Sequence, residues 1–342
     1  MLIRILAGLS VKICYAKQFL LGSETHGGPA PMKRVLGATA LALAGVMSVA
    51  GPASAMELWD PHLRGVDEGL AAGALPPPGV YGVFNNYWAS FNAYDNNGKK
   101  VPGTGLQAFV AVPIALWSTG IKVLGADFGM AIAQPFDYTS AQPGYGTGVG
   151  SGNWGLFNTV LVPGILSWTL GDFHVSTSLS MYLPTATSTL SGLVVHGHNV
   201  NGGLPSGNGY FAVQPDFGVS WLHDGWNLSA SLHLTVPVTA SNDTGYSYKS
   251  GNQFSGDYTA TKTLGKWTFG LGVHQQNQVS PDSSNGPNVI APKGNAVNFG
   301  LGPIVGYTFG NGVELQGIWN HDVIVRNDVG GDFFNVRLVT AF

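Results

Sequence analysis

The chain has 342 residues and is poor in charge: Asp, Glu, Lys and Arg make up 10% of it, and 50 residues are glycine. Soluble domains average about 25% charged residues and about 7% glycine. With a net charge of −3 and no cluster of Lys and Arg, the composition argues against nucleic acid or anionic lipid as a partner, since both require grouped cations.

The N-terminal part predicts export. Met32-Lys33-Arg34 is positive, 35–50 is apolar, and Ala53-Ser54-Ala55 has the small-residue pattern that precedes signal-peptidase cleavage. We therefore interpret 32–55 as a secretory signal peptide and 1–31 as an upstream, mis-assigned extension. The alternative is that 35–50 stays as a membrane anchor, but this stretch is short for a span.

The chain that remains after cleavage starts at Met56. It lacks Cys14, the one cysteine, so neither a disulfide nor a thiolate metal site is expected. Its net charge is −7, because the removed part holds five basic residues and one acidic residue. We expect 56–78 to form a periplasmic lead-in or a small plug.

From residue 79 onwards, apolar and polar residues alternate, which is typical of strands with one lipid-facing side. No apolar run reaches the length of about 18 residues that a membrane-spanning helix needs. One clear apolar set is Phe173, Val175, Thr177, Leu179, Met181 and Leu183. Twelve strands are predicted: 79–94, 104–117, 121–134, 155–169, 172–184, 209–222, 226–238, 247–263, 266–279, 293–309, 312–325 and 332–342.

Short and long connections between these strands alternate. The short ones are 118–120, 170–171, 223–225, 264–265 and 310–311. The longer ones are 95–103, 135–154, 185–208, 239–246, 280–292 and 326–331. This pattern predicts an all-β fold: a transmembrane antiparallel β-barrel over 79–342, with about 12 strands, short periplasmic turns and longer extracellular loops. It places the chain in the bacterial outer membrane, in contact with lipid, and the alternative is a secreted β-sandwich.

Five prolines fall inside the predicted strands: Pro113, Pro163, Pro215, Pro237 and Pro303. Proline removes a donor from the hydrogen-bond ladder, and a closed barrel has no free edge to accommodate it. We therefore expect bulges at these positions.

The last strand, Asp332 to Phe342, ends on an aromatic residue, as do the closing strands of bacterial outer-membrane barrels. Such a strand is expected to engage the barrel-assembly machinery through Phe342.

Several segments resemble the MetA-pathway phenol-degradation family, a group of predicted outer-membrane transporters. They are Pro76 to Tyr81, Asn85-Asn86-Tyr87, Asp95 to Lys99, Asp172-Phe173-His174, Tyr182 to Thr185, Tyr248 to Phe254 and Trp267 to Gln276. Ala186 stands where the family usually has glycine. The resemblance implies an outer-membrane channel for uptake of small, aromatic or hydrophobic molecules by passive diffusion through the lumen.

The parity of the strands predicts which polar side chains line that lumen. The candidates are Asp127, His174, Tyr182, Asp216, His233, His274, Gln276, Glu314, Asp322 and Arg337. Aromatic rings such as that of Tyr182 could stack against solutes. No catalytic residues, cofactor or bound metal are expected.

Two other functions remain open. His174 and Ser176 share a strand face, as the pair in an outer-membrane acyl hydrolase would. A structural or adhesive barrel would instead act through the loops from Asp137 to Asn153 and from Thr185 to Asn208. We interpret His196-Gly197-His198 as a solvated loop and the glycine-rich stretch 144–152 as a flexible surface link.

Overall fold

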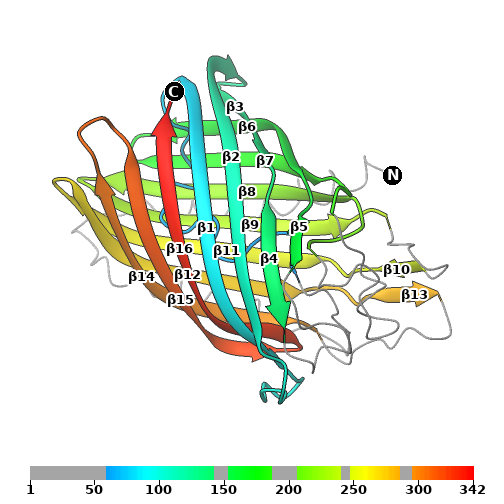
Figure 1. Ribbon diagram of the computed structural model, residues 1–342. Helices are drawn as coiled ribbons and strands as arrows, with labels where there is room; N and C mark the ends of the chain where they lie inside the picture. Colours follow the sequence, from blue (N-terminus) through cyan, green and yellow to red (C-terminus); the bar gives the residue numbers. More distant parts are fainter. Residues whose placement is uncertain (1–58, 142–152, 187–205, 240–246, 286–294) are drawn as a thin grey trace, which may run out of the picture. The chain divides into compact units, whose positions relative to one another are not determined.

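The structure, a computed structural model, describes residues 59–141, 153–186, 206–239, 247–285 and 295–342 (Figure 1). The chain divides into the units Met1–Val49 and Ala50–Phe342, and every described residue belongs to the second. The predicted signal peptide, the 1–31 extension, the pair His196 and His198, and the 144–152 link all lie outside the described residues. Within the described residues, no helix is long and apolar enough to cross a membrane.

Sixteen strands are found in the described ranges. They are β1 (Gly79–Tyr94), β2 (Leu106–Val123), β3 (Ala126–Ala133), β4 (Phe136–Ala141), β5 (Asn153–Leu156), β6 (Val160–Leu170), β7 (Phe173–Tyr182), β8 (Ala212–His223), β9 (Trp226–Pro237), β10 (Ser247–Lys249), β11 (Gln253–Leu264), β12 (Trp267–Gln278), β13 (Ser283–Asn285), β14 (Val297–Thr308), β15 (Glu314–Arg326) and β16 (Asp328–Ala341).

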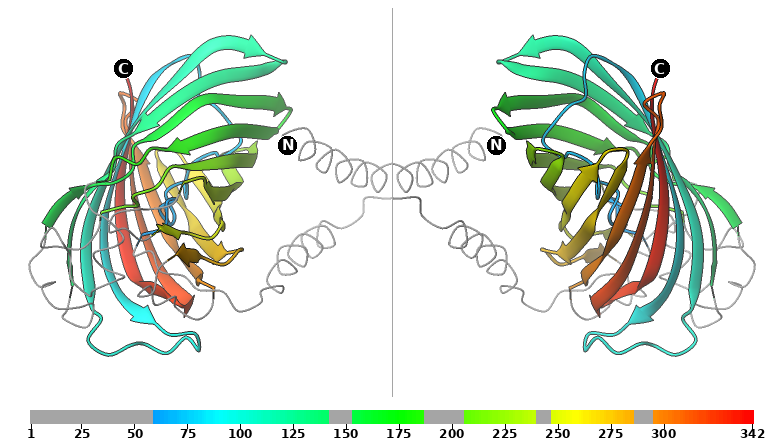
Figure 2. Two further views of the ribbon diagram at one scale, coloured as in Figure 1. Left: turned by 90° about the vertical axis from the view of Figure 1, so that its right-hand side faces the viewer. Right: turned by 90° about the vertical axis from the view of Figure 1, so that its left-hand side faces the viewer.

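The main sheet closes into a barrel. β1 pairs with β16 on one side and with β2 on the other, and the remaining neighbours are antiparallel (Figures 1 and 2). β3 and β4 both pair with β2 and follow one another along a single stave, and β5 and β6 continue one another in the same way. The barrel therefore has twelve staves, which confirms the predicted fold. β10 and β13 form a separate pair.

Four predicted connections differ from the structure. The 135–154 link contains β4 and the first residues of β5, and the 280–292 link contains β13. The turn expected at 118–120 is an irregularity within β2, where Gly120 has φ 74° and the register to β3 shifts; the true turn is Leu124-Gly125, at φ 52° and 78°. The long link expected at 326–331 is a tight turn at Asn327, whose φ is 47°. Asparagine tolerates this left-handed conformation better than most residues, so no longer loop is needed.

The expected bulge is found at one of the five prolines, Pro163. Pro113, Pro215 and Pro303 lie where pairing on one side is interrupted without a register shift, and Pro237 is the last residue of β9. Pro163 lies in the bulge between β6 and β7, where the register shifts between Leu161 and Ile165. Pro113 sits opposite the break between β3 and β4, so its missing N–H coincides with a gap in pairing. A proline at such a site costs less than one in a continuous ladder.

The outer face of the barrel is apolar. In β7, Phe173 and Leu179 are exposed while Ser176, Ser180 and Tyr182 face inward and are buried. Aromatic rings gather at both ends of the wall: Trp267 packs on Tyr307 near the short turns, and Trp88 packs on Phe109 towards the other end. An apolar band between aromatic rings is typical of barrels that sit in lipid.

Candidate functional site: a lumen segment and the cavity beside it

Residues 59–78, the lumen segment, run through the interior of the barrel (Figure 2, blue). Its backbone is bound to inward-facing side chains of several strands. The N–H groups of Gly65 and Asp67 donate to the carboxylate of Asp257 at 3.0 and 2.9 Å, and the N–H of Gly69 donates to Thr259 at 2.8 Å. Asp257 and Thr259 lie in the middle of β11, so the segment fills the lumen and does not lie at its mouth.

Charged side chains fix the first half of the lumen segment. Arg64 donates to Gln276 at 2.7 Å and to the Val329 carbonyl at 2.6 Å, and it pairs with Asp328 at 2.9 Å. On β16, Arg337 is fully buried and donates to the carbonyls of Val66 and Glu68.

Glu68 is the buried carboxylate of the segment. It accepts from Asn320 at 2.6 Å and lies 3.5 Å from the Nδ1 atom of His274. Burial raises the pKa of Glu68, and the nearby His274 opposes that effect. The carboxyl group is thus tied to the wall through β12 and β15.

Three serines hold the second half of the segment against the opposite wall. Ser176 donates to the Ala72 carbonyl and Ser167 to the Gly73 carbonyl, both at 2.8 Å, and Ser220 accepts from the Gly73 N–H at 2.8 Å. At the point where the backbone of the lumen segment touches the barrel wall, the wall residue is a glycine, Gly218. A Cβ at Gly218 would overlap the Ala72 carbonyl oxygen.

A cavity of about 640 Å³ lies between the lumen segment and one side of the barrel. One wall is apolar and comes from β1, β2, β3 and β6: Val83, Val110, Val112, Ile114, Leu116, Ala131, Val160 and Val162. The segment adds Leu63, Val66, Leu70 and Leu75. The other wall is polar and comes from β7, β8 and β9: Ser176, Ser178, Ser180, Tyr182, Gln214, Asp216, Ser231 and His233. A space of this size is typical of small-molecule sites.

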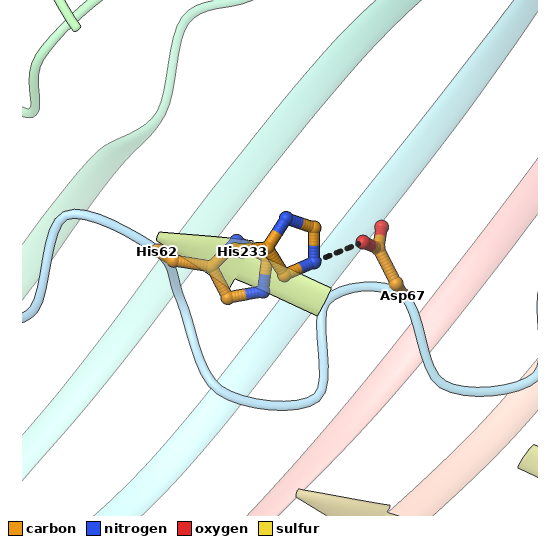
Figure 3. Close-up of side chains that lie close together, drawn as sticks. All are labelled: His62, Asp67 and His233. Atoms are coloured by element: carbon orange, nitrogen blue, oxygen red, sulfur yellow. Dashed lines mark ion pairs between the residues drawn. The ribbon is translucent and has the colours of Figure 1, made fainter. Parts of the chain in front are cut away.

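His62, Asp67 and His233 meet at the edge of this cavity (Figure 3). The Nε2 atom of His233 is 3.1 Å from Asp67, and the two imidazole rings stack with their centroids 3.9 Å apart. These three side chains carry the kinds of ligand atoms that bind a metal ion.

The sequence matches the family described as "Putative MetA-pathway of phenol degradation" over residues 90–338. The chain belongs to this family. The match covers most of the barrel and both walls of the cavity, so the family resemblance of the sequence is confirmed. No curated protein matches the sequence.

Solved structures agree on the fold of this family member. The COG4313 outer membrane channel from Pseudomonas putida F1 aligns with a TM-score of 0.66 at 15% identity, over 81% of this chain and 100% of that chain. A FadL homologue from Pseudomonas aeruginosa aligns with a TM-score of 0.41 at 11% identity, over 86% of this chain and 99% of that chain. The first likeness shows the outer-membrane barrel fold, and the second is too weak to add to it.

The ten predicted lumen residues fall into three groups in this family member. His274, Gln276, Asp322 and Arg337 contact the lumen segment or the side chains that hold it. Tyr182, Asp216 and His233 line the cavity. Asp127, His174 and Glu314 lie near the short turns and bond to Lys122, Thr169 and Gln316 respectively.

The apolar wall was missed by sequence reasoning, and a signal for it exists. Along β2, from Ala108 to Trp117, apolar residues occupy both parities, so the alternation seen elsewhere is lost. An apolar run on the inward face indicates a lipophilic lumen there rather than an aqueous one. The lumen segment has a comparable signal, since Asp60, His62, Arg64, Asp67 and Glu68 fall close together before the first strand.

Proposed function

We propose that this protein is an outer-membrane channel through which small hydrophobic molecules, aromatic ones included, diffuse passively along the cavity. The observation that carries the proposal is the cavity's two-sided lining: an apolar wall beside a row of hydroxyl, amide and carboxylate groups. Transfer of an apolar solute into such a space costs little free energy, because its surface contacts the apolar wall. A hydroxyl group on the solute can hydrogen-bond to the polar wall. Membership of a phenol-degradation family supports this solute class.

The lumen segment has a part in the proposal. The segment occupies the centre of the barrel and is bonded to both walls. The route for a solute is therefore the cavity beside the segment and not an open pore. We propose that the segment acts as a plug that excludes larger and strongly hydrated solutes. We also propose that 32–55 is cleaved on export and that the strand ending in Phe342 engages the assembly machinery.

The acyl-hydrolase alternative receives less support. The described contacts pair Ser176 with the Ala72 carbonyl at 2.8 Å and His174 with Thr169 at 3.2 Å, rather than with each other. A serine nucleophile needs a hydrogen bond to its base. The adhesive alternative depends on loops that lie largely outside the described residues.

Filling the cavity tests the passage. Ala131 lies on β3 and faces the cavity, so Ala131→Phe forces a ring into the path. If moving the ring aside for a solute costs as much as overpacking a core, about 1–3 kcal/mol, solute flux should fall about 10- to 100-fold, since 1.4 kcal/mol is a factor of ten. The measurement is uptake of toluene and phenol into proteoliposomes. Val305→Phe on the outer face is the matched control, and equal fluxes in the two variants would exclude this route.

The location in the membrane has its own test. Leu271 points outward from β12 and is 53% exposed, so we propose that it faces lipid. Leu271→Arg should then destabilise the folded barrel in bilayers by about 2–4 kcal/mol if it lies at the midplane. Urea titration of the protein refolded into liposomes measures this. An unchanged midpoint would mean that this face is not in contact with lipid.

A further inference from the structure

We propose that His62, Asp67 and His233 bind one divalent transition-metal ion at the edge of the cavity. One possible ligand atom from each of the three residues lies within 4.8 Å of those of the other two. Both imidazoles are nearly inaccessible, at 4% and 5% exposure, while the Asp67 carboxylate is 29% exposed. Figure 3 shows Asp67 facing the His233 ring. The site goes beyond the proposed transport, because a channel needs no such ion.

In each histidine, one ring nitrogen is close to a carboxylate, and the other nitrogen remains for the ion. The Oδ1 atom of Asp216 is 2.7 Å from Nδ1 of His233, which leaves Nε2 towards Asp67. The Oδ2 atom of Asp257 is 3.4 Å from Nε2 of His62, which leaves Nδ1 as the ligand atom. Metal-binding histidines almost always donate their second N–H to such a partner, which fixes the tautomer and the ring.

The charge balance of the cluster favours a cation. Three carboxylates, those of Asp67, Asp216 and Asp257, surround two imidazoles, and their described ion pairs are all to histidine. With both rings neutral, as metal binding requires, the cluster carries three negative charges. A divalent ion would offset most of that charge.

The donor set selects the kind of ion. Two imidazole nitrogens and one carboxylate oxygen suit Zn²⁺ and its neighbours in the first transition row rather than Ca²⁺ or Mg²⁺, which prefer oxygen ligands. The separation of 3.1 Å between His233 and Asp67 is close to that of two ligands about 2.1 Å from one zinc ion. His62 supplies the third ligand atom, which lies within 4.8 Å of the other two, and binding would bring the three atoms closer together.

The ion would join two parts of the molecule. His62 and Asp67 belong to the lumen segment, whereas His233 belongs to β9. Metal binding would therefore fasten the segment to the polar wall of the cavity, and the cavity gives the ion its route of entry.

The test is Zn²⁺ binding by the exported protein, purified from outer membranes and stripped with a chelator. Calorimetry should show one Zn²⁺ per chain. His62→Gln and His233→Gln should each weaken binding at least about tenfold, and Asp216→Asn should do so about 10- to 100-fold through the orientation of His233. Substituting Co²⁺ should give a visible absorption spectrum that both histidine variants lose.

The control variant removes a histidine elsewhere. His321→Gln changes an exposed ring that is paired with Asp332 and should not alter the affinity. Heat-dependent mobility in gels checks that every variant is folded. Because His62 lies outside the strands, its variant keeps the test valid if a wall variant fails to fold. Absence of Zn²⁺ binding, or binding that is equal in the wild type and His62→Gln, would overturn the proposal.

Discussion

Replacing Arg337 with methionine is expected to release the lumen segment and make the barrel conduct ions. The Arg337 guanidinium is fully buried and donates to the carbonyls of Val66 and Glu68 in the segment, and to the amide oxygens of Asn85 and Gln316 in the wall. Methionine retains much of the apolar stem but offers none of these donors.

The cost falls on the segment more than on the barrel. A buried carbonyl left without its donor costs about 1–3 kcal/mol, and two such carbonyls belong to the segment. The wall also loses the donors to Asn85 and Gln316, but Asn85 keeps a hydrogen bond from Asn335. The wall no longer has to bury a charge, and an apolar replacement of a buried charge is often tolerated. The population of chains with an unseated segment should therefore rise at least about tenfold, since 1.4 kcal/mol is a factor of ten.

Two measurements report the release. Conductance in planar bilayers should increase, and trypsin should cut after Arg64, which is only 7% exposed while the segment is seated. Arg326→Met removes an exposed arginine from the end of the neighbouring strand and should change neither readout. If Arg337→Met remains as resistant to trypsin as the wild type, the carbonyl contacts do not hold the segment.

The barrel strands can be predicted from the sequence because each strand has its own local pattern. Apolar and polar residues must alternate in a strand that separates lipid from a polar lumen, so β7 can be predicted from Phe173 to Tyr182 without knowledge of its neighbours. A proline likewise predicts an interruption in strand pairing, because the missing N–H is a property of the residue itself. The partner of each strand followed from the connections, since short turns force antiparallel neighbours.

The interior of the barrel is harder to predict from the sequence, because its contacts join residues that are far apart along the chain. Nothing near Gly218 in the sequence indicates that the backbone at Ala72 will pack against it, and Arg64 gives no sign of meeting Asp328 until the barrel has closed. His233 was placed in the lumen by parity alone, but its proximity to His62 depends on the path of a segment with no regular period. Turn errors such as that at 118–120 had a different cause, a glycine with positive φ within a strand.

The second large effect is expected from Gly218→Leu, which should displace the segment from the opposite wall. Gly218 faces inward from β8, and even a Cβ there would overlap the Ala72 carbonyl and crowd the Ser176 hydroxyl. The overlap is with backbone, so a small rotation of a side chain cannot relieve it. The segment must move, and the bonds that Ser176, Ser167 and Ser220 make to it are lost together.

The three serine bonds to Ala72 and Gly73 are worth about 0.5–1.5 kcal/mol each, so their joint loss should again raise the unseated population at least about tenfold. The strands keep their pairing, because Gly218 has an ordinary extended backbone and its partner Ser231 is unaffected. Trypsin cleavage after Arg64 and conductance should therefore both rise in a barrel that still shows heat-dependent mobility.

Gly317→Leu is the matched control, since a Cβ there lies 3.6 Å from Phe334 on the outer face, an ordinary contact. Flux of toluene separates this variant from Arg337→Met. Leucine at 218 projects into the cavity that the segment borders, so Gly218→Leu should conduct ions yet carry toluene no faster than the wild type, whereas Arg337→Met leaves the cavity free. A Gly218→Leu barrel with wild-type resistance to trypsin would show that the segment does not lie against β8.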